Sequence, residues 1–483
     1  MTAVTEFVHA DPADPPTLGT GPQWNCTVAT FESAAPIAGA ALDSPRAVDS
    51  GESWSLVVAG WVVGRGSPPV EVHVLHDGDV IGRTPVDRER ADVAAAFPSQ
   101  EGSDRPGFRL HVGILGLPAS APLEVVAVHP NGARAHLATI HVAHRGLTTP
   151  HAPRMAPISV TSLGRMGTTW LMRLLGSHPD IAVHPQYPYE LGVAKHWAHL
   201  LLVAAGPADH TWSAHPETLT ADGARVGHNP YFGDFLAGSP DLNQWLGVRQ
   251  PALLGACAQQ SLDEFYGRVD SGAGAGHFAE KCLPDHVPDV LADLYPQWQE
   301  IILVRDIRDV VCSAIAFDAK RKRQSFGREL LADDLDFVTQ LQVDFGKLLR
   351  SWERRRPSSL LVAYEDLVTA PAATVGQVFG HLGLPHTPAV VARVLETASA
   401  SSPELDGHRT TSDPAASIGR WRTDLAAIHP ELTGRCEDLF GPLLTDFGYS
   451  VQPSRSRRMH ERLDVVLGAL PAPTPPVPEP ATS

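Results

Sequence analysis

One segment of this chain restricts its possible folds more than any other: an apolar run that leads through a glycine-containing loop into a helical pattern. Residues 158–163 (ISVTSL) have the composition of a β-strand, and GRMGTTW follows at 164–170. Leucines then recur at helical spacing until a glycine at 176 predicts the helix end. In such a strand–loop–helix unit, backbone N–H groups and the helix dipole attract an anion. The segment therefore predicts an α/β fold with a phosphate or sulfate site.

The loop also carries side chains that suit an anion. Arg165 supplies a positive charge, and Thr168 and Thr169 supply hydroxyl donors. The Walker A loop of P-loop nucleotide kinases and NTPases has the pattern GxxxxGK[ST]. Here the spacing is shorter and no lysine precedes the threonines. A P-loop nucleotide kinase or NTPase is therefore an alternative that the loop itself disfavours.

Two further apolar runs end in residues that suit a ligand site. One run ends at Arg305, and a helical pattern that contains Ser313 follows it as far as Phe317. A second run, 360–363, ends at Tyr364. Ligands of open α/β sheets bind at the C-terminal ends of the strands. Arg305 and Tyr364 are therefore expected at the same edge of the sheet as the glycine loop.

These motifs resemble those of the sulfotransferases that use 3′-phosphoadenylyl sulfate (PAPS), and the resemblance extends over residues 157–450. It implies a P-loop-like, three-layer α/β fold with a central parallel sheet. It also implies transfer of a sulfuryl group from PAPS, the sulfate donor, to a hydroxyl or amine of an acceptor. The acceptor would be a small molecule or a glycan, such as a carbohydrate or a natural product. The donor-binding residues that the resemblance implies are Gly164, Arg165, Met166, Gly167, Thr168, Thr169, Trp170, Arg305, Ser313, Tyr364 and Arg420.

The resemblance also implies a role for each part of the donor site. The loop residues would hold the 5′-phosphosulfate, whereas Arg305 and Ser313 would hold the 3′-phosphate. Trp170 and Tyr364 would lie near the adenine. Arg420 would complete the nucleotide site from the C-terminal part of the domain.

In-line transfer at sulfur needs cationic groups beside the sulfonate and a base for the acceptor proton. Arg165 is the first cationic candidate, and Lys281 in the segment FAEKCLP (278–284) is the second. This segment resembles the Lys-Thr-His-Leu-Pro segment of cytosolic sulfotransferases, and Cys282 stands at the position of their catalytic histidine. The identity of the base is therefore open among Glu280, Glu190, His184, His286 and Cys282.

The rest of the chain divides into regions of different composition. Short alternating runs with turn signals at Asp77-Gly78 and Asn131-Gly132 predict a β-sandwich. This part resembles the accessory β-domains of some bacterial glycosyltransferases and sulfotransferases. The expected regions are a flexible leader at 1–24, the β-sandwich at 25–143, a linker at 144–156, the sulfotransferase domain at 157–450, and a C-terminal helix with a proline-rich disordered tail at 451–483.

Composition excludes several classes of protein. The formal net charge of −16 argues against nucleic acids and anionic membranes as partners. No apolar run is long enough to span a membrane, and no signal peptide is visible. The five cysteines lack disulfide or zinc-ligand spacing, so we expect no metal and a cytoplasmic location. A non-catalytic nucleotide- or glycan-binding module is the other alternative, and the oligomeric state is open.

Overall fold

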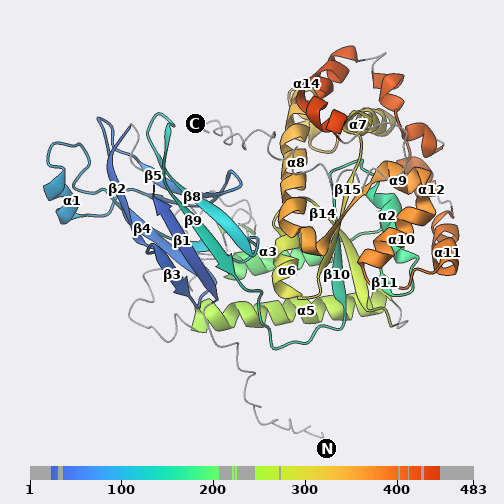
Figure 1. Cartoon of the computed structure of the whole chain (residues 1–483), viewed down its shortest axis with the longest axis horizontal. Helices are drawn as coiled ribbons and strands as arrows, with labels where there is room; N and C mark the ends of the chain where they lie inside the picture. Colours follow the sequence, from blue (N-terminus) through green and yellow to red (C-terminus); the bar gives the residue numbers. More distant parts are fainter. Residues whose placement is uncertain are drawn as a thin grey trace, which may run out of the picture.

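The computed structural model describes residues 23–30, 36–205, 220–221, 224–225, 245–270, 274–400, 403–411, 413–425 and 429–446. This part of the chain forms two regions, one of antiparallel sheets and one of a parallel sheet with helices (Figure 1). Residues 1–22 of the predicted leader and the predicted tail at 451–483 lie outside the described residues. No helix within the described ranges is both long and apolar enough to cross a membrane.

The first region consists of two antiparallel sheets, as the alternating pattern predicted. Six strands form one sheet in the order β3-β1-β9-β8-β5-β6, and three strands form the other in the order β2-β4-β7. The strands and the short helix of this region are β1 (Trp24–Thr30), β2 (Ile37–Ser44), β3 (Val48–Gly51), β4 (Ser55–Gly64), β5 (Glu71–His76), β6 (Asp79–Pro85), α1 (Ala91–Ala96), β7 (Gly107–Gly113), β8 (Ser120–Val128) and β9 (Arg134–His144).

Both predicted hairpins are confirmed. β5 and β6 pair around a turn in which Asp77 (φ +51°) and Gly78 (φ +86°) have left-handed backbone conformations. Positive φ at both central residues is the type I′ arrangement, whose twist matches that of the flanking strands. β8 and β9 pair around the second turn, where Gly132 has a φ of +79°. The turn residues thus determine which strands are neighbours in the larger sheet.

The second region contains a five-stranded parallel sheet in the order β11-β14-β10-β15-β16. Three of its strands, β10, β15 and β16, are those that the apolar runs predicted. The sheet is formed by β10 (Ala156–Thr161), β11 (Ile181–Ala182), β14 (His277–Cys282), β15 (Gln299–Val304) and β16 (Ser359–Ala363). Because the strands are parallel, the segments that follow β10, β14, β15 and β16 all leave from one edge.

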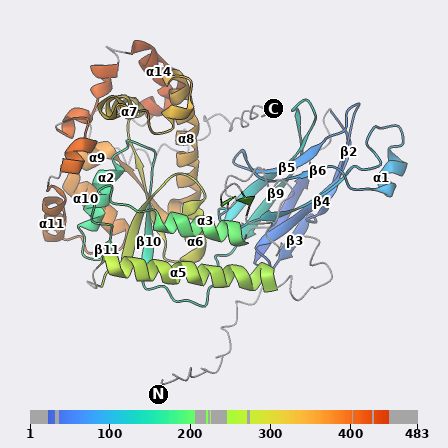
Figure 2. The ribbon, with the colours of Figure 1, turned by 180° about the vertical axis from the view of Figure 1, so that it is seen from behind.

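Helices cover both faces of the parallel sheet (Figures 1 and 2). The helices of this region are α2 (Thr168–Gly176), α3 (Val193–Ala205), α5 (Gln250–Val269), α6 (Val287–Leu294), α7 (Ile307–Arg321), α8 (Asp334–Arg355), α9 (Tyr364–Thr369), α10 (Pro371–His381), α11 (Pro388–Ala398), α12 (Pro403–His408) and α14 (Pro430–Asp446). The shorter elements are strands β12 (Thr220–Ala221) and β13 (Ala224–Arg225), a π-helical turn (Trp245–Arg249), and 3₁₀ turns (Arg328–Leu330, Arg356–Ser358, Ala415–Ser417 and Arg420–Arg422).

The alternation of side chains along the strands identifies the two faces. In β15, Ile301 and Leu303 pack into one hydrophobic cluster with α2, α10 and α11. Ile302 and Val304 point to the other face and pack with α7, α8 and α14. Successive strand residues face opposite sides of a sheet. The face on which a strand residue lies therefore determines which other side chains it can contact near the sheet edge.

Two predicted helices are present, and one is longer than predicted. α2 ends at Gly176 as expected. α7 continues to Arg321, about one turn beyond the predicted end at Phe317. It stops at Lys322, which has a φ of +54° and donates its backbone N–H to Asp318 O. The left-handed residue ends the helix, and the apolar pattern alone did not indicate that position.

The segment predicted to be a linker, residues 144–156, is anchored by buried side chains and by backbone hydrogen bonds. Leu147 and Met155 are buried in the hydrophobic cluster that also contains the core of the β region. The backbone N–H of Leu147 donates to Asp293 O (2.7 Å). Those of Arg154 and Met155 donate to the Asp263 carboxylate (2.9 and 3.1 Å). Asp263 lies on α5 and Asp293 on α6, so two helices of the α/β region fix this segment.

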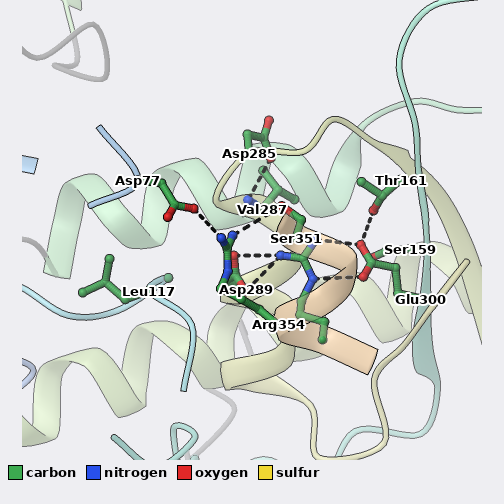
Figure 3. Close-up of polar contacts among 12 residues, drawn as sticks. Asp77, Leu117, Ser159, Thr161, Asp285, Val287, Asp289, Glu300, Ser351 and Arg354 are labelled. Carbon is green, nitrogen blue, oxygen red and sulfur yellow. Dashed lines mark hydrogen bonds and ion pairs between the residues drawn. The ribbon is translucent and has the colours of Figure 1, made fainter. Parts of the chain in front are cut away.

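The two regions share one hydrophobic cluster and several charged contacts. The cluster continues from both β-sheets into α3, α5 and α6. In both Figure 1 and Figure 2, α5 runs along one side of the molecule beneath both regions. Arg354 on α8 pairs with Asp77 in the β5–β6 hairpin (Figure 3). Lys347, also on α8, pairs with Asp79 of the same hairpin (2.9 Å). The β region is therefore packed against the α/β region as part of a continuous core.

A buried ionic network lies beside the Arg354–Asp77 pair (Figure 3). Arg355 pairs with Asp289 (3.0 Å) and with Glu300 (2.9 Å) near the start of β15. Glu300 also accepts hydrogen bonds from Ser359 (2.6 Å) and Thr161. Burial lowers the pKa of Arg355, but the charges of Glu300 and Asp289 outweigh burial and raise that pKa above its ordinary value. Each charge of this network thus has an opposite charge within contact distance.

Candidate active site

The glycine loop connects β10 to α2 as predicted. Gly167 is the N-cap of α2 and has a φ of +98°, and no side chain caps this helix terminus. A Cβ at Gly167 would lie 2.3 Å from Tyr364 Cδ2, so a larger residue would collide with the tyrosine ring. Glycine is thus required both by the backbone conformation and by the close ring. The N–H groups of the first helical turn remain without a side-chain cap, which suits an anion.

Arg165 extends from this loop into a site formed by three other segments. Its Nε donates to Ser313 Oγ (3.0 Å) on α7, and its Nη1 contacts His408 Nε2 (3.0 Å) at the end of α12. The guanidinium lies 4.5 Å from the centroid of the Phe317 ring. Burial, and secondarily the charge of Arg305, lower the pKa of Arg165 to about 10. The loop therefore presents a half-buried cation to the space above the sheet edge.

Arg305 lies directly after β15 and is held against the same loop. It is 5% exposed, and its Nη1 and Nη2 donate to Arg165 O (3.1 Å) and Ser417 O (2.8 Å). Its guanidinium lies 4.4 Å from the centroid of the Tyr364 ring, and the Tyr364 hydroxyl contacts Ser417 Oγ (3.0 Å). Within the described residues, Arg305 Nε has no hydrogen-bond partner. Tyr364 thus supports both the loop glycine and the arginine.

The two arginines form a positively charged site, and no carboxylate of the described residues is in contact with either guanidinium. Among the described residues, neither Arg165 nor Arg305 forms an ion pair, and their hydrogen bonds go to neutral groups. Buried charges are ordinarily paired, because desolvation penalises an isolated ion. The buried Arg305 and the half-buried Arg165, beside an uncapped helix N-terminus, therefore define a site that an anion would stabilise.

A second cluster adjoins this site at the end of β14. Lys281 Nζ donates to Glu190 Oε1 (3.1 Å) and to Pro188 O (2.8 Å), both in the loop that follows β11. Burial lowers the pKa of Lys281. The Glu190 side chain is 33% exposed, and Lys281 contacts only one of its oxygens. The pair combines a cation with a carboxylate that solvent can reach.

Glu280, the neighbour of Lys281 in β14, faces the other side of the sheet. It is 2% exposed and accepts backbone N–H groups from Val193 (2.8 Å) and Ala194 (3.1 Å), as well as the Tyr266 hydroxyl. Burial raises the pKa of Glu280. The Glu280 carboxylate thus binds the N-terminus of α3 and stabilises the fold.

Residues 157–388 match the model of the sulfotransferase family. That segment belongs to the sulfotransferase family. A solved sulfotransferase domain from the curacin biosynthetic pathway is 16% identical, covers 60% of this chain and 98% of its own, and has a TM-score of 0.34. A mouse sulfotransferase complexed with PAP is 13% identical (60% and 85% coverage, TM-score 0.32). A sulfotransferase from Alicyclobacillus acidocaldarius is 18% identical (60% and 96% coverage, TM-score 0.30). No curated protein matches the chain.

The remaining residues that were predicted to bind the donor differ in where their side chains lie. Thr169 is buried, Thr168 and Gly164 are half-buried in the loop, and Trp170 packs partly against the core while Arg173 lies above its ring. Met166 is fully buried in the hydrophobic cluster with α7 and α8, so only its backbone borders the loop.

Arg420 has partners of its own. It pairs with Asp424, and its Nη1 donates to Thr410 Oγ1 (3.1 Å). The segment that contains it is fixed by Asp309, which accepts the backbone N–H groups of Gly419 (2.7 Å) and Trp421 (2.9 Å). This segment thus contacts the site through the Ser417 backbone O, which accepts from Arg305, whereas the Arg420 charge is compensated by Asp424.

The other base candidates have different surroundings. Cys282 is buried, and burial raises the pKa of its thiol well above the ordinary value. His184 follows β11 and His286 precedes α6, and both are half-buried. Within the described residues, no group of three or more histidine, cysteine or carboxylate side chains has the arrangement of a metal site.

Sequence reasoning missed His408 and the role of Tyr187. His408 lies at the end of α12 and contacts Arg165, which is 243 positions earlier in the chain. The Tyr187 hydroxyl contacts His408 Nδ1 (2.9 Å). No motif or spacing in the sequence connects these segments, because only the folded chain brings α12 over the glycine loop.

Proposed function

We propose that this protein transfers a sulfuryl group from PAPS to a hydroxyl or amine of a small-molecule or glycan acceptor. One observation carries the proposal: the half-buried Arg165 and the buried Arg305 lie side by side at the strand ends, without an ion-paired carboxylate among the described residues. A donor with separate 5′- and 3′-phosphate groups would supply the missing negative charge. The family of residues 157–388 is consistent with this donor.

The residues at the sheet edge fit the two charged ends of such a donor. Arg165 and the first N–H groups of α2, beside Gly167, would hold the 5′-phosphosulfate. Arg305 and Ser313 would hold the 3′-phosphate, because Arg305 retains an unused Nε donor. Trp170 and Tyr364 would border the adenine. When bound, the donor supplies the activated sulfuryl group, and the protein supplies charge and orientation.

Lys281 and Glu190 would act on the acceptor side of the transfer. The Lys281 ammonium would stabilise the charge on the sulfonate oxygens as the bond to the leaving phosphate lengthens. Glu190 would take the acceptor proton, because its second carboxylate oxygen is not engaged by Lys281. Glu280 is the poorer choice, since its carboxylate already accepts N–H and O–H donors from α3 and α5.

The donor assignment is tested by calorimetric titration with 3′,5′-adenosine bisphosphate (PAP), in parallel with magnesium and with EDTA. Tight binding that does not depend on the metal is expected, followed by transfer of labelled sulfate from PAPS to a screened acceptor. Absence of PAP binding, or binding that requires magnesium, would overturn the proposal and favour a P-loop nucleotide kinase. 5′-AMP is the matched control ligand, because it lacks the 3′-phosphate.

The base assignment is tested by two matched substitutions. Glu190→Gln should lower kcat by about 10²-fold while leaving the calorimetric affinity for PAP unchanged, because only proton transfer is lost. Glu280→Gln makes the same chemical change on β14 and should lower the melting temperature, while kcat per folded molecule is retained. The opposite pattern would assign the base to Glu280.

A further inference from the structure

Two residues near Arg165 have no role in the proposed reaction so far: Tyr187, in the loop after β11, and His408, at the end of α12. His408 Nε2 lies 3.0 Å from Arg165 Nη1, and His408 Nδ1 lies 2.9 Å from the Tyr187 hydroxyl. The neighbour of Tyr187, Pro188, accepts a hydrogen bond from Lys281. Tyr187 therefore lies between the two cations that the proposed transfer uses.

The contacts determine where the imidazole proton is. A guanidinium can only donate hydrogen bonds, so His408 Nε2 must be the acceptor for Arg165. Burial, followed by the charges of Arg165, Lys281, Arg321 and Lys320, lowers the pKa of His408 to about 3, so the ring is neutral near pH 7. The single proton is therefore on Nδ1 and is donated to the Tyr187 oxygen. The hydroxyl hydrogen of Tyr187 is consequently free to be donated to another group.

The imidazole is also held in one position. Its ring contacts the Tyr187 ring (5.5 Å between centroids) and the Phe317 ring (5.4 Å). The backbone O of His408 accepts from Arg165 Nη2 (3.3 Å). Lys320 on α7 donates to the backbone O atoms of Asp406 (2.8 Å) and Arg409 (2.9 Å), on either side of it. The end of α12 is thus tied to α7, and His408 is fixed between Arg165 and Tyr187.

We propose that Tyr187 is a further catalytic residue that donates its hydroxyl hydrogen to the sulfonate of the donor, and that His408 is the positioning residue for both Tyr187 and Arg165. This inference rests on the proposed function. The tyrosine keeps its proton throughout, so the hydroxyl only stabilises charge on the sulfonate oxygens while the sulfur–oxygen bonds form and break. A fixed donor of this kind accelerates transfer because it needs no reorganisation when the charge develops.

Tyr187→Phe removes only the hydroxyl, and Tyr189→Phe makes the same change two residues away in the same loop. Affinity is measured by calorimetry for PAPS without acceptor and for PAP. Tyr187→Phe should weaken PAPS binding about tenfold, as expected for loss of a hydrogen bond to a charged group, and should leave PAP binding unchanged, because PAP has no sulfonate. It should also lower kcat about 10- to 100-fold, whereas Tyr189→Phe changes neither value. Equal behaviour of the two variants would overturn the inference.

Two substitutions separate the contacts of His408. Glutamine can place an acceptor near the position of Nε2, whereas asparagine can place a donor near the position of Nδ1. His408→Gln should therefore resemble Tyr187→Phe in its ratio of PAPS to PAP affinity, and the two together should show little further loss. His408→Asn should retain the wild-type ratio of PAPS to PAP affinity. It should still lower kcat, because Arg165 Nη1 loses its acceptor at His408 Nε2. If the losses of His408→Gln and Tyr187→Phe were additive in the double variant, the role of His408 would be purely structural.

The outcomes also separate this inference from the proposed function. If the wild-type protein neither binds PAP nor transfers sulfate, the proposed function fails and this inference fails with it. If the wild-type protein does both and Tyr187→Phe behaves like the wild type, only the role of Tyr187 and His408 is wrong. Melting temperatures of all variants show whether each loss arises at the site or from unfolding.

Discussion

Arg355 and Arg165 are both largely buried beside the parallel sheet, but their surroundings are opposite. Arg355, near the start of β15, contacts the carboxylates of Asp289 and Glu300. Arg165, beyond the other end of the sheet, contacts a serine, a histidine and an aromatic ring. Burial lowers the pKa of both arginines, but the two carboxylates outweigh burial for Arg355, whereas the pKa of Arg165 falls to about 10. A compensated cation stabilises the fold, and an uncompensated one is available to a ligand.

The two clusters also differ in whether the chain itself satisfies their hydrogen-bonding groups. Glu300 contacts Arg355, Ser359 and Thr161, so the network is satisfied by the chain itself. The site at the strand ends instead retains an unused donor on Arg305. Breaking a buried pair leaves an isolated charge, whereas removing a cation that has no partner removes a desolvation penalty. Substitutions in the two clusters should therefore differ in their effect on stability: loss of Arg355 should lower it, whereas loss of Arg165 or Arg305 should change it little.

The largest expected effect is on the compensated cluster. Arg355→Met leaves Asp289 and Glu300 buried without a cation and should lower the free energy of unfolding by roughly 3–5 kcal/mol. Denaturant titration measures this loss. Arg354→Met is the matched control on the adjacent residue, whose partner is the partly exposed Asp77, and it should cost about 1 kcal/mol or less. Equal losses for both variants would contradict the comparison.

Arg305→Ala should leave stability nearly unchanged and weaken PAP binding by roughly 30-fold or more, or about 2 kcal/mol, because a buried charged contact to the 3′-phosphate is lost. Binding of 5′-AMP should change little. Calorimetry with both ligands measures the difference. The assignment of Arg305 to the 3′-phosphate is wrong if both affinities fall by the same factor.

Arg165→Ala should chiefly lower kcat, by about 10²-fold, since the charge that it stabilises is redistributed in the transition state. Stability should be retained, because the arginine has no carboxylate partner among the described residues. Steady-state kinetics with PAPS separates kcat from KM. A change confined to KM would instead mean that Arg165 only contributes to ground-state binding.

The last effect concerns acid stability. The pKa of His408 is about 3 in the folded protein and 6.5 in its ordinary state. Between these values the unfolded chain binds a proton that the folded chain does not, so stability should fall as the pH falls from about 6.5 towards 3. His408→Asn should show a flatter profile over this window. Unfolding curves at several pH values measure it, and identical slopes for the two proteins would exclude the effect.

Local patterns predicted the elements that carry the site. The glycine loop with α2, the strand ending at Arg305 and the Asp77-Gly78 hairpin all follow from residues that are neighbours in sequence. Strand composition, loop glycines and helical spacing act over a few residues, so they can be read without the fold. The pattern could not show that Met166 faces the core or that Arg420 pairs with Asp424, because both depend on packing from distant segments.

The segment predicted to be a linker likewise has contacts that the local sequence pattern could not predict. Its prolines and lack of periodicity indicated a segment without regular structure. The structure anchors it through Asp263 and Asp293, which lie on two helices more than a hundred residues away. The buried core that joins the two regions is likewise a property of the packed helices and sheets.

The amino-acid sequence by itself determined the parallel-sheet unit, its glycine loop and the arginine that follows β15, since each depends on local backbone preference and side-chain type. Only the tertiary structure decided which charges are compensated. In β14, Glu280 and Lys281 are adjacent, yet strand alternation sends one to α3 and the other to Glu190. At the loop, α12 brings His408 to Arg165 across most of the domain. Contacts of this kind depend on register and on helix packing, because charge pairing acts through space and not along the chain.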